Sequence, residues 1–527
     1  MSVFQLLERG AALCAGRPFL RFEGREIGYP DALALARKIA AALAGRGFGR
    51  GDHAAVLSPN EPNAFIASFG ILGAGLSYVP ANPRNAPAAT EAALDLLDVR
   101  VLFYHGAFEP LVQDLRSRSS KIALFVRLDA GETASMRLQD LVADADPAAE
   151  LPLPRLSDTA FVGQTGGTTG EPKGVLISHG AVIAFVEKYL AELPDAAPVL
   201  LAATPLTHAA GMLAMPAVAQ GGTIVLMAQP DLPRFLDLIG EERVTTAFLP
   251  PTAIYRLLDL PDVAGRDYSS LRHFLYGAAP MSVERLRQAL DVFGPVMTQS
   301  YGQTECHTFI TLMRPADHFL DGRIAGDARL SACGRPTLGT TVVIRSDDGR
   351  RTPVGEAGEI CVQSDLAMSG YYKDPVATAE VIRDGFVHTG DIGFVDADGF
   401  LHIVDRKKEL IISGGFNVYP AEVETVVAGH PCVSDCAVVG VADPHWGEAV
   451  TAVVELKSGA ELTGEDLLAF CRPRLGGVKT PKRVAFWPQL PRSAAGKVLR
   501  KEVRAALSAR DAGSDAATGA ALTDGDR

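Results

Sequence analysis

The stretch GQTGGTTGEPKG, residues 163–174, lies between a run that predicts a β-strand and a run that predicts a helix. It contains five glycines and one lysine, Lys173. Glycines let several backbone amides point into one concavity, and a lysine adds a mobile positive charge, so this loop is suited to hold a polyphosphate. It is not the common P-loop, because Lys173 lies between Pro172 and Gly174 instead of between a glycine and a hydroxyl residue. Taken alone, the stretch could also be a flexible surface turn.

Helical and strand-like patterns alternate on both sides of this loop. Residues 30–47 and 282–294 have apolar side chains at helical spacing, whereas residues 53–59 and 273–280 are short apolar runs. This alternation is typical of βα units built around a mostly parallel sheet. The sequence therefore predicts an α/β fold that extends to about residue 330.

The pattern changes in the second part of the chain. Residues 331–405 are rich in turns and short alternating runs, which predicts antiparallel strands or a small β-barrel. Residues 407–508 form a compact α+β pattern, in which Thr463 is expected to cap a helix. Residues 509–527 contain too little apolar surface to pack, so we expect a disordered tail. We predict a large N-terminal domain of residues 1–406 and a small C-terminal domain after it.

Composition and charge exclude several classes of protein. A chain of 527 residues suggests at least two domains, and 47% hydrophobic with 21% charged residues is ordinary for a globular protein. The net charge of −12 and the lack of a basic run argue against a nucleic-acid partner.

Two regions of the sequence indicate where in the cell the protein is expected. Residues 196–230 contain no Asp, Glu, Lys or Arg, but prolines and glycines interrupt them, so we expect buried strands around a buried helix and no integral membrane segment. Near the start, Glu8 and Arg9 fall where a secretory signal needs an apolar core. We therefore expect a cytoplasmic protein whose seven cysteines are free thiols.

Four further motifs follow the loop. They are YGQTE at 301–305, HTGD at 388–391, DRKKELIISGGFNVYPAEVE at 405–424 and PRSAAGKVLR at 491–500. In this order and spacing, the five blocks resemble the adenylate-forming superfamily, which includes acyl-CoA synthetases, peptide-synthetase adenylation domains and beetle luciferases. The resemblance is nearest to bacterial acyl-CoA synthetases and covers residues 10 to 505. One tetrapeptide could arise by chance, but five ordered blocks are very specific.

The resemblance implies a reaction in two steps. A carboxylate attacks the α-phosphate of ATP, which gives an acyl-adenylate and pyrophosphate, and a thiol then displaces AMP. The implied cofactors are ATP, Mg²⁺ and coenzyme A. Catalysis of the first step is largely positioning and charge stabilisation by the metal, cations and backbone amides.

The resemblance also assigns roles to residues. Lys173 would grip the β- and γ-phosphates, Glu305 would hold Mg²⁺ and Thr304 would touch the α-phosphate. Asp391 would accept the ribose hydroxyls with help from Arg406. The implied catalytic residues are Lys497, Glu305 and Thr304. The implied cofactor-binding residues are Thr165, Gly166, Gly167, Thr168, Thr169, Gly170, Lys173, Gly277, Ala278, Ala279, Tyr301, Gly302, Asp391, Arg406, Lys408, Gly414 and Gly415. Each alone could equally be a turn residue or a surface ion pair.

The C-terminal domain is expected to be mobile. In the superfamily a lysine matching Lys497 reaches the acyl carboxylate and the α-phosphate during adenylation. The domain then rotates about a hinge that matches Lys408, and a pantetheine tunnel opens. Gly414 and Gly415 would line that tunnel, although paired glycines also suit a plain turn.

Small apolar residues dominate the segments that match the acid pocket. The implied pocket residues are His208, Ala209, Gly211, Ala214 and Gln299. They would leave volume for a hydrophobic acid, possibly bulky or cyclic, unless neighbouring side chains fill it. Residues 207–214 lack the aspartate that pairs with an amino-acid substrate, and no carrier domain follows, so free CoA is the expected acceptor.

The loop departs from the superfamily pattern at Gln164 and Gly166, where most members have an aromatic residue and a serine. Two alternatives to a complete acyl-CoA synthetase therefore remain open. The enzyme could perform one half-reaction, either thioester formation from a supplied acyl-adenylate or adenylation alone. The protein could also be a nucleotide-binding scaffold without turnover, but a scaffold has no chemical need for Lys497.

Overall fold

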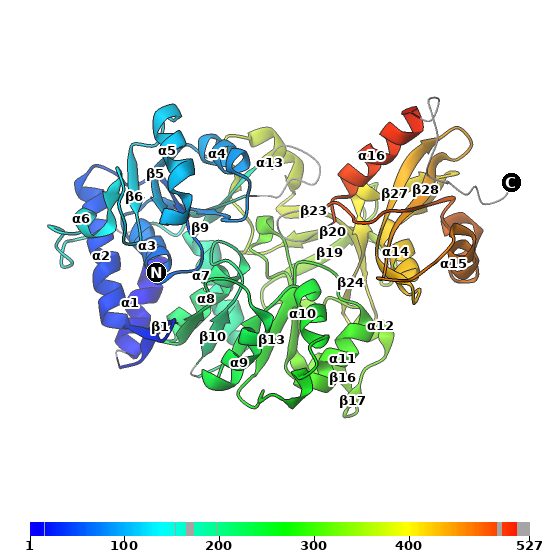
Figure 1. Ribbon diagram of the computed structural model, residues 1–527, viewed down its shortest axis with the longest axis horizontal. Helices are drawn as coiled ribbons and strands as arrows, with labels where there is room; N and C mark the ends of the chain where they lie inside the picture. The colour runs from blue at the N-terminus through cyan, green and yellow to red at the C-terminus, as the bar shows by residue number, and fades with distance from the viewer. Residues whose placement is uncertain (15, 153, 165–172, 197, 493–497, 514–527) are drawn as a thin grey trace. The chain divides into compact units, whose positions relative to one another are not determined.

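The computed structural model describes residues 1–527 apart from 15, 153, 165–172, 197, 493–497 and 514–527, which are grey in Figure 1. The chain divides into two compact units. The larger unit comprises residues 1–166, 172–342 and 362–388, and the smaller one includes residues 343–361 and 389–527. The domain boundaries expected at residues 330, 406 and 508 stay predictions.

The larger unit contains two sheets of mostly parallel strands, which confirms the predicted α/β class. The first has the order β21-β9-β8-β4-β3-β5-β6-β7. Its strands are β21 (Gly370–Tyr371), β9 (Gly174–Ser178), β8 (Thr159–Gln164), β4 (Ser77–Ala81), β3 (His53–Leu57), β5 (Val99–Tyr104), β6 (Leu124–Arg127) and β7 (Met136–Arg137). All five residues of β3 are buried, as expected for a central strand between parallel neighbours.

The glycine-rich loop does not lead into a helix. Residues Gly174–Ser178 form strand β9, which pairs antiparallel with β8, and only then does helix α7 (His179–Glu192) begin. The prediction of a helix directly after the loop was wrong because GVLIS is a short apolar run that completes a hairpin with β8. The Ser178 side chain accepts a hydrogen bond from the Ala181 amide and caps α7.

The second sheet has the order β18-β15-β14-β13-β12-β10-β11-β1-β2. Its strands are β18 (Arg335–Pro336), β15 (Thr311–Met313), β14 (Met297–Tyr301), β13 (His273–Gly277), β12 (Thr246–Phe248), β10 (Val199–Ala202), β11 (Thr223–Leu226), β1 (Pro18–Phe22) and β2 (Arg25–Gly28). Strands β11, β10, β12, β13 and β14 run parallel to one another. Their carboxyl ends therefore share one edge, where α/β proteins usually bind ligands.

Helices cover these sheets (Figure 1). They are α1 (Phe4–Leu13), α2 (Tyr29–Gly45), α3 (Pro62–Gly73), α4 (Pro87–Leu96), α5 (Glu109–Arg118), α6 (Leu138–Leu141), α8 (Ala209–Ala219), α9 (Leu232–Glu241), α10 (Pro251–Leu258), α11 (Val283–Phe293), α12 (Asp327–Leu330) and α13 (Pro375–Val381). Helices α3 and α8 are apolar on all sides and mostly buried. This confirms that the uncharged segment around α8 is core, and none of the described helices is long and apolar enough to span a membrane.

A sheet occupies residues 341–406, and its strands between residues 382 and 406 pair antiparallel, as the turn-rich sequence predicts. Its order is β19-β20-β23-β22, and β24 pairs with β23. The strands are β19 (Thr341–Arg345), β20 (Gly358–Gln363), β22 (Ile382–Arg383), β23 (Phe386–Val395) and β24 (Leu401–Arg406). The division between the two units falls inside β19, β20 and β23. Whether these strands close into a barrel stays a prediction.

The end of the chain forms the predicted α+β unit. Its sheet has the order β26-β25-β28-β27, with β29 paired to β28. The elements are β25 (Ile411–Ser413), β26 (Phe416–Val418), α14 (Pro420–Ala428), β27 (Val433–Asp443), β28 (Gly447–Leu456), α15 (Gly464–Lys479), β29 (Arg483–Phe486) and α16 (Arg500–Gly513). Thr463 caps α15 by accepting from the Asp466 amide at 3.1 Å, as predicted. Helix α16 continues past residue 508, where the tail was expected to begin.

Candidate active site

The YGQTE motif forms a tight turn at the carboxyl end of β14. A Cβ atom on Gly302 would lie 2.3 Å from the Thr308 carbonyl carbon, so this position requires glycine. The turn continues as a short 3-10 helix, Thr304–Cys306, in which the His307 amide donates to the Thr304 carbonyl at 3.2 Å. The Met368 amide donates to the Glu305 carbonyl at 2.8 Å, which fixes the backbone that carries the Glu305 carboxylate.

Glu305 and Lys173 meet at one tyrosine that sequence reasoning missed. The Tyr371 hydroxyl donates to Glu305 Oε1 at 2.8 Å, and Lys173 Nζ lies 4.9 Å from the centre of the Tyr371 ring. Burial, followed by the neighbouring Glu305 charge, raises the pKa of Tyr371, so the phenol keeps its proton and remains a donor. Lys173 Nζ also lies 3.5 Å from Asp374 Oδ2. No local motif marks Tyr371, since it reaches Glu305 from 66 residues along the chain.

The start of the glycine-rich loop lies against the same turn. Gly163 directly precedes Gln164, the last residue of β8. A Cβ atom on Gly163 would lie 2.7 Å from the Thr304 methyl carbon. Strand β8 therefore brings the start of the loop to Thr304, and Lys173 directly precedes β9. Thr165, Gly166, Gly167, Thr168, Thr169 and Gly170 lie outside the described residues, and so does Lys497.

Expected cofactor-binding residues at the ends of β13 and β14 share one sheet edge. Strands β13 and β14 are parallel, with Gly277 opposite Ser300, so Gly277, Ala278 and Tyr301 all lie at the carboxyl ends of neighbouring strands. A Cβ on Gly277 would lie 2.4 Å from the Ser300 carbonyl oxygen, which requires glycine. Ala278 is exposed with a φ of 65°, an unusual backbone for a residue with a side chain. Ala279 follows and is half-buried.

The expected acid-pocket residues belong to helix α8 and its entrance. His208 is exposed, while Gly211 and Ala214 are buried and Ala209 is half-buried. Gly211 is required by packing, because a Cβ there would lie 1.9 Å from the Leu206 carbonyl oxygen. Gln299 lies near the Tyr276 hydroxyl, with 3.3 Å between that oxygen and Gln299 Oε1.

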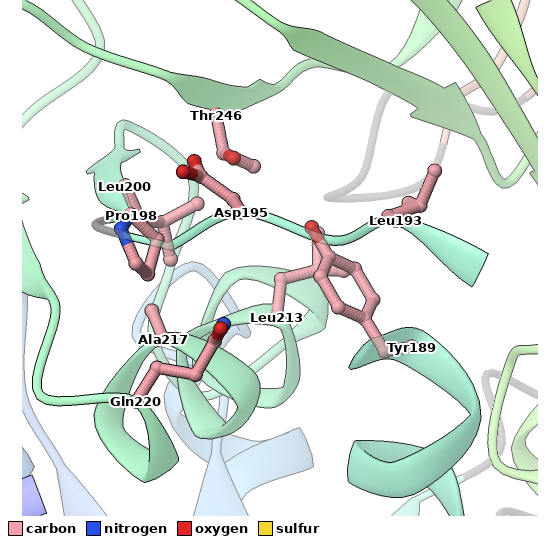
Figure 2. Close-up of a pocket in the computed structure, with 9 residues that line it drawn as sticks. All are labelled: Tyr189, Leu193, Asp195, Pro198, Leu200, Leu213, Ala217, Gln220 and Thr246. Atoms are coloured by element: carbon pink, nitrogen blue, oxygen red, sulfur yellow. The ribbon is translucent and has the colours of Figure 1, made fainter. Parts of the chain in front are cut away.

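A small cavity of about 10 Å³ lies beside α8. Figure 2 shows that Leu213, Ala217 and Gln220 reach it from α8 or its end, and Tyr189 from α7. Asp195 also lines it. This volume holds roughly one water molecule. None of the predicted site residues lines it.

A larger cleft of about 530 Å³ lies between the β1–β2 hairpin and α9. Ion pairs such as Arg21 with Glu26 and Arg234 with Glu241 line it, and no predicted site residue does. The chemistry of the side chains, rather than the volume of these hollows, therefore locates the candidate site.

A buried histidine two residues after Glu305 has no hydrogen-bond partner among the described residues. His307 is 1% exposed, and neither ring nitrogen has a partner within the described part of the chain. Burial lowers the pKa of His307 to about 3, so the ring is neutral at pH 7. The Phe185 ring of α7 packs edge-on at 5.2 Å. Leaving such a group unsatisfied costs about 1–3 kcal/mol.

In the smaller unit, the predicted ribose-binding pair lies on one hairpin. Asp391 on β23 is directly opposite Arg406 on β24, and Arg406 Nε lies 2.6 Å from Asp391 Oδ1. Asp391 is 3% exposed, and its amide donates to the Thr389 hydroxyl at 3.1 Å. The structure therefore brings these two residues together, while their roles stay predictions.

The predicted tunnel glycines form a hairpin turn. Gly414 and Gly415 connect β25 to β26, with φ values of 58° and 80°. Two left-handed residues in a two-residue hairpin loop favour Gly-Gly. A Cβ on Gly414 would lie 3.1 Å from the Trp446 ring, so close packing also favours glycine. Lys408 lies between β24 and β25 in a short 3-10 helix.

Sequence reasoning also missed Arg500, which begins α16 three residues after Lys497. Arg500 Nε donates to Glu424 Oε1 at 2.9 Å, and the same guanidinium pairs with Glu409. Its Nη1 lies 3.8 Å from Asp405 Oδ1. The motif PRSAAGKVLR contains this arginine, but its three carboxylate partners lie far away in the sequence.

Two family models match the chain. The AMP-binding enzyme model matches residues 7–372, and the AMP-binding enzyme C-terminal domain model matches residues 422–497.

The chain is similar to known relatives and to solved structures over most of its length. A medium/long-chain fatty-acid–CoA ligase of Mycobacterium tuberculosis is 38% identical over 90% of this chain and 80% of the relative. A feruloyl-CoA synthase of an Amycolatopsis species is 37% identical over 92% and 95%. An amide bond synthetase from Marinactinospora thermotolerans has a TM-score of 0.86 at 33% identity, covering 96% of this chain and 99% of that one. An o-succinylbenzoate CoA synthetase from Bacillus subtilis, with its acyl-adenylate, has a TM-score of 0.84 at 27% identity, covering 95% and 98%.

Proposed function

The chain belongs to the family of AMP-binding enzymes and is an acid–thiol ligase, and we propose that it converts a hydrophobic, bulky or cyclic carboxylic acid to its CoA thioester. The acid carboxylate attacks the α-phosphate of ATP, the bond between the α- and β-phosphates breaks, and pyrophosphate leaves. The thiol of CoA then gives its proton to solvent and its sulfur attacks the acyl carbon of the adenylate. The bond from this carbon to the phosphate oxygen breaks, and AMP leaves with the bonding electrons.

The observation that supports this proposal best is the cluster of Glu305, Tyr371 and Lys173 beside the start of the glycine-rich loop. A carboxylate held by a neutral phenol at 2.8 Å, with an ammonium over the same ring, suits a metal–polyphosphate ligand. Carboxylate oxygens are ligands that Mg²⁺ prefers, so the residue present fits the metal. Mg²⁺ bound at Glu305 would neutralise charge on the phosphate oxygens.

Lys173 would exchange partners when ATP binds. Its ammonium lies 3.5 Å from the Asp374 carboxylate, and both side chains are well exposed, so this pair is weak and easily replaced. Polyphosphate oxygens carry more charge than one carboxylate and would draw Lys173 to themselves. Thr304 would hold the α-phosphate from the turn that precedes Glu305. Tyr301 would stack on adenine, next to Gly277 and Ala278.

We assign further steps to the smaller unit. Asp391 and Arg406 would bind the ribose hydroxyls, and Lys497 would stabilise charge during adenylation. Rotation about Lys408 would follow, with Gly414 and Gly415 facing the pantetheine arm of CoA. The ion pair of Asp391 with Arg406 supports the ribose role, because the arginine holds the carboxylate in one orientation.

The names of the relatives and the side chains of α8 support the proposal of a hydrophobic acid as the substrate. The relatives include enzymes named for fatty acids, ferulate and indoleacetate. Small side chains at Ala209 and Ala214 suit apolar acids, and residues 207–214 carry no acidic side chain for an ammonium group. All seven cysteines are free thiols. They fit a reducing compartment, and we propose the cytoplasm.

The test is product analysis by mass spectrometry. The protein is incubated with MgATP and aliphatic, aryl and polycyclic acids, with CoA, with a primary amine, or with neither. Pyrophosphate and an acyl-CoA from one acid class are expected. An amide without any thioester would make the protein an amide synthetase and contradict the proposal.

The half-reaction alternative has a specific observation in its favour, the replacement of the usual aromatic and serine residues by Gln164 and Gly166. The same product analysis distinguishes this alternative from a complete acyl-CoA synthetase. If no acid yields pyrophosphate, but supplied acyl-adenylate and CoA give thioester, the enzyme performs only the second step.

A further inference from the structure

The side chain of Asn60 joins the two sheets of the larger unit. Asn60 follows β3 of the first sheet and is 5% exposed. Its Nδ2 donates to the Ala202 carbonyl at the end of β10, at 3.2 Å, and to the Met227 carbonyl just after β11, at 3.0 Å. Strands β10 and β11 belong to the second sheet. One buried amide therefore links the carboxyl ends of strands from both sheets.

The same amide holds the segment between β10 and α8, residues 203–208, which we call the α8 entry loop. Asn60 Nδ2 also donates to the Thr204 carbonyl at 2.9 Å, and Asn60 Oδ1 accepts from the Leu206 amide at 2.8 Å. An asparagine side chain has two N–H donors and one carbonyl acceptor, so these contacts use both ends of it. Asn60 thus binds the entry loop on both sides of Pro205.

The entry loop has few anchors of its own. The hydroxyl oxygens of Thr204 and Thr207 are buried, and neither has a hydrogen-bond partner among the described residues. His208 is the N-cap residue of α8, and its side chain makes no capping hydrogen bond within the described chain. The His208 amide donates locally to the Pro205 carbonyl at 2.9 Å. Because the polar side chains of the loop do not fix it, its position depends largely on Asn60.

The entry loop in turn sets the position of α8. A Cβ atom on Gly211 would lie 1.9 Å from the Leu206 carbonyl oxygen, so the backbone of Leu206 lies directly against the first turn of the helix. The Gly211 amide donates to the His208 carbonyl at 3.0 Å. A shift of Leu206 would therefore move His208 and the start of α8, which the proposed function places at the acid.

We propose that Asn60 is a positioning residue that sets the affinity for the acid and the choice among acids. It does so by fixing the entry loop and, through the backbone of Leu206, the start of α8. This inference rests on the proposed function, and it gives Asn60 no contact with the acid or with ATP. A displacement of about 1 Å caused by a remote substitution can cost about 10²-fold in rate, so a pocket wall needs such support.

Steady-state kinetics of acyl-CoA formation test the proposal with hexanoate, decanoate, cinnamate and indoleacetate. Asn60→Ala removes all the contacts of the amide, and Asn60→Ser leaves a hydroxyl too short to reach from Thr204 to Leu206. Asn63→Ala is the matched control, because Asn63 Nδ2 donates to the Leu128 carbonyl at 3.1 Å, away from the entry loop.

The expected result is a change in KM for the acid that is not matched for ATP. Asn60→Ala should raise the KM for the acid about tenfold, and Asn60→Ser about threefold, while the KM for ATP changes less than about twofold. The ratio of kcat/KM between the best and the worst acid should change about threefold or more in Asn60→Ala. Asn63→Ala should leave both KM values and this ratio as in the wild type.

Hydrogen exchange gives a readout that does not depend on turnover. In the wild type the bond to Asn60 protects the Leu206 amide. In Asn60→Ala, peptides that cover residues 203–211 should exchange about tenfold faster, whereas peptides from β6 should keep the wild-type rate. Mass spectrometry of the free protein measures both, and circular dichroism verifies that each variant is folded.

The outcomes are distinct. If Asn60→Ala lowers kcat alike for every acid and leaves both KM values unchanged, Asn60 acts on stability alone and the inference is overturned. An equal rise in the two KM values also overturns it. If Asn60→Ala does not fold, Asn60→Ser decides, and wild-type KM values for every acid overturn the inference. If no acid gives a thioester with the wild-type enzyme, the proposed function fails, while unchanged exchange at residues 203–211 would show separately that Asn60 does not hold the loop.

Discussion

Two parts of the larger unit that adjoin the YGQTE turn differ in how their polar groups are satisfied. On the nucleotide side, Glu305 accepts from Tyr371, and Lys173 lies near Asp374 and over the Tyr371 ring. Two residues after Glu305, His307 is buried against the Phe185 ring, and neither of its ring nitrogens has a hydrogen-bond partner among the described residues. Binding of ATP would therefore replace existing contacts of Glu305 and Lys173.

This difference follows from charge. An ammonium or a carboxylate is too costly to leave buried and unpaired, so the nucleotide side is partly exposed and self-paired. A neutral imidazole costs much less, and burial keeps His307 neutral. A fold can therefore leave a buried imidazole without a partner at a smaller cost than an ammonium such as Lys173 or a carboxylate such as Glu305.

The largest effect is expected from Lys497→Ala, which tests whether the nucleotide side is complete without the C-terminal lysine. Adenylation should fall by about 10²–10³-fold, because one cation at the developing charge is lost. Thioester formation from supplied acyl-adenylate should survive. Both rates are measured separately by single-turnover kinetics, and equal loss of both would contradict separate roles for the two half-reactions.

Glu305→Gln and Tyr371→Phe rank next and separate a metal ligand from its support. Glu305→Gln keeps the shape of the side chain but removes the charge, and should lower adenylation by about 10²-fold and raise the Mg²⁺ requirement. Tyr371→Phe removes only the donor to Glu305 and should cost about tenfold. Rates are measured over a range of Mg²⁺ concentrations. A larger loss for Tyr371→Phe than for Glu305→Gln would refute this order.

Substitutions of the two buried histidines, His318 and His307, are expected to have effects of intermediate size, on the free energy of unfolding. His318→Phe removes two buried hydrogen bonds, to the Tyr276 hydroxyl and to the Arg314 carbonyl, and should lower the free energy of unfolding by about 1–3 kcal/mol. His307→Phe removes a ring that has no hydrogen-bond partner among the described residues, so it should lower the free energy of unfolding less than His318→Phe does. Urea unfolding at pH 7 measures both, and an equal loss for the two variants would remove the distinction between them.

The same variants predict a pH effect. The folded protein holds His307 with a pKa of about 3, below the unfolded value, so the unfolded chain binds the proton first as pH falls. Stability is therefore present above the unfolded pKa and is lost as pH falls toward the folded one. His307→Phe should weaken this acid sensitivity, which urea unfolding between pH 7 and pH 4 measures.

The smallest effect is expected from Asp374→Asn, which tests partner exchange on the nucleotide side. Asp374 caps α13 by accepting from the Ala377 amide at 2.9 Å, and asparagine keeps this cap. Without the negative charge, Lys173 loses a competing partner, so the KM for ATP should fall about two- to threefold. Steady-state kinetics at saturating acid measure it. An increased KM would show that Asp374 helps to hold ATP.

Much of this fold could be predicted from the sequence because its signals are local. Buried parallel strands such as residues 53–57 are continuous apolar runs, and Thr463 caps its helix through an amide three residues away. The strand at residues 174–178 was missed for a local reason too, since its five residues are too few to distinguish it from the helix that follows.

The candidate site was only partly predictable. Motifs place Glu305, Lys173 and Asp391 because glycines and charged residues stand in fixed local patterns. Tyr371 and the partners of Arg500 are brought in by tertiary structure from distant segments, so no local pattern marks them. His307 lies two residues after the YGQTE motif, and only its burial and the lack of a hydrogen-bond partner among the described residues distinguish it from any other core histidine.

The central claim is that this chain forms an acyl-adenylate despite the replacements at Gln164 and Gly166. The most direct measurement is exchange of labelled pyrophosphate into ATP, with MgATP and one acid and without CoA. Exchange is expected to depend on the acid, to require Mg²⁺ and to be lost in Lys497→Ala. Absence of acid-dependent exchange with every acid that yields an acyl-CoA, or full exchange in Lys497→Ala, would contradict it.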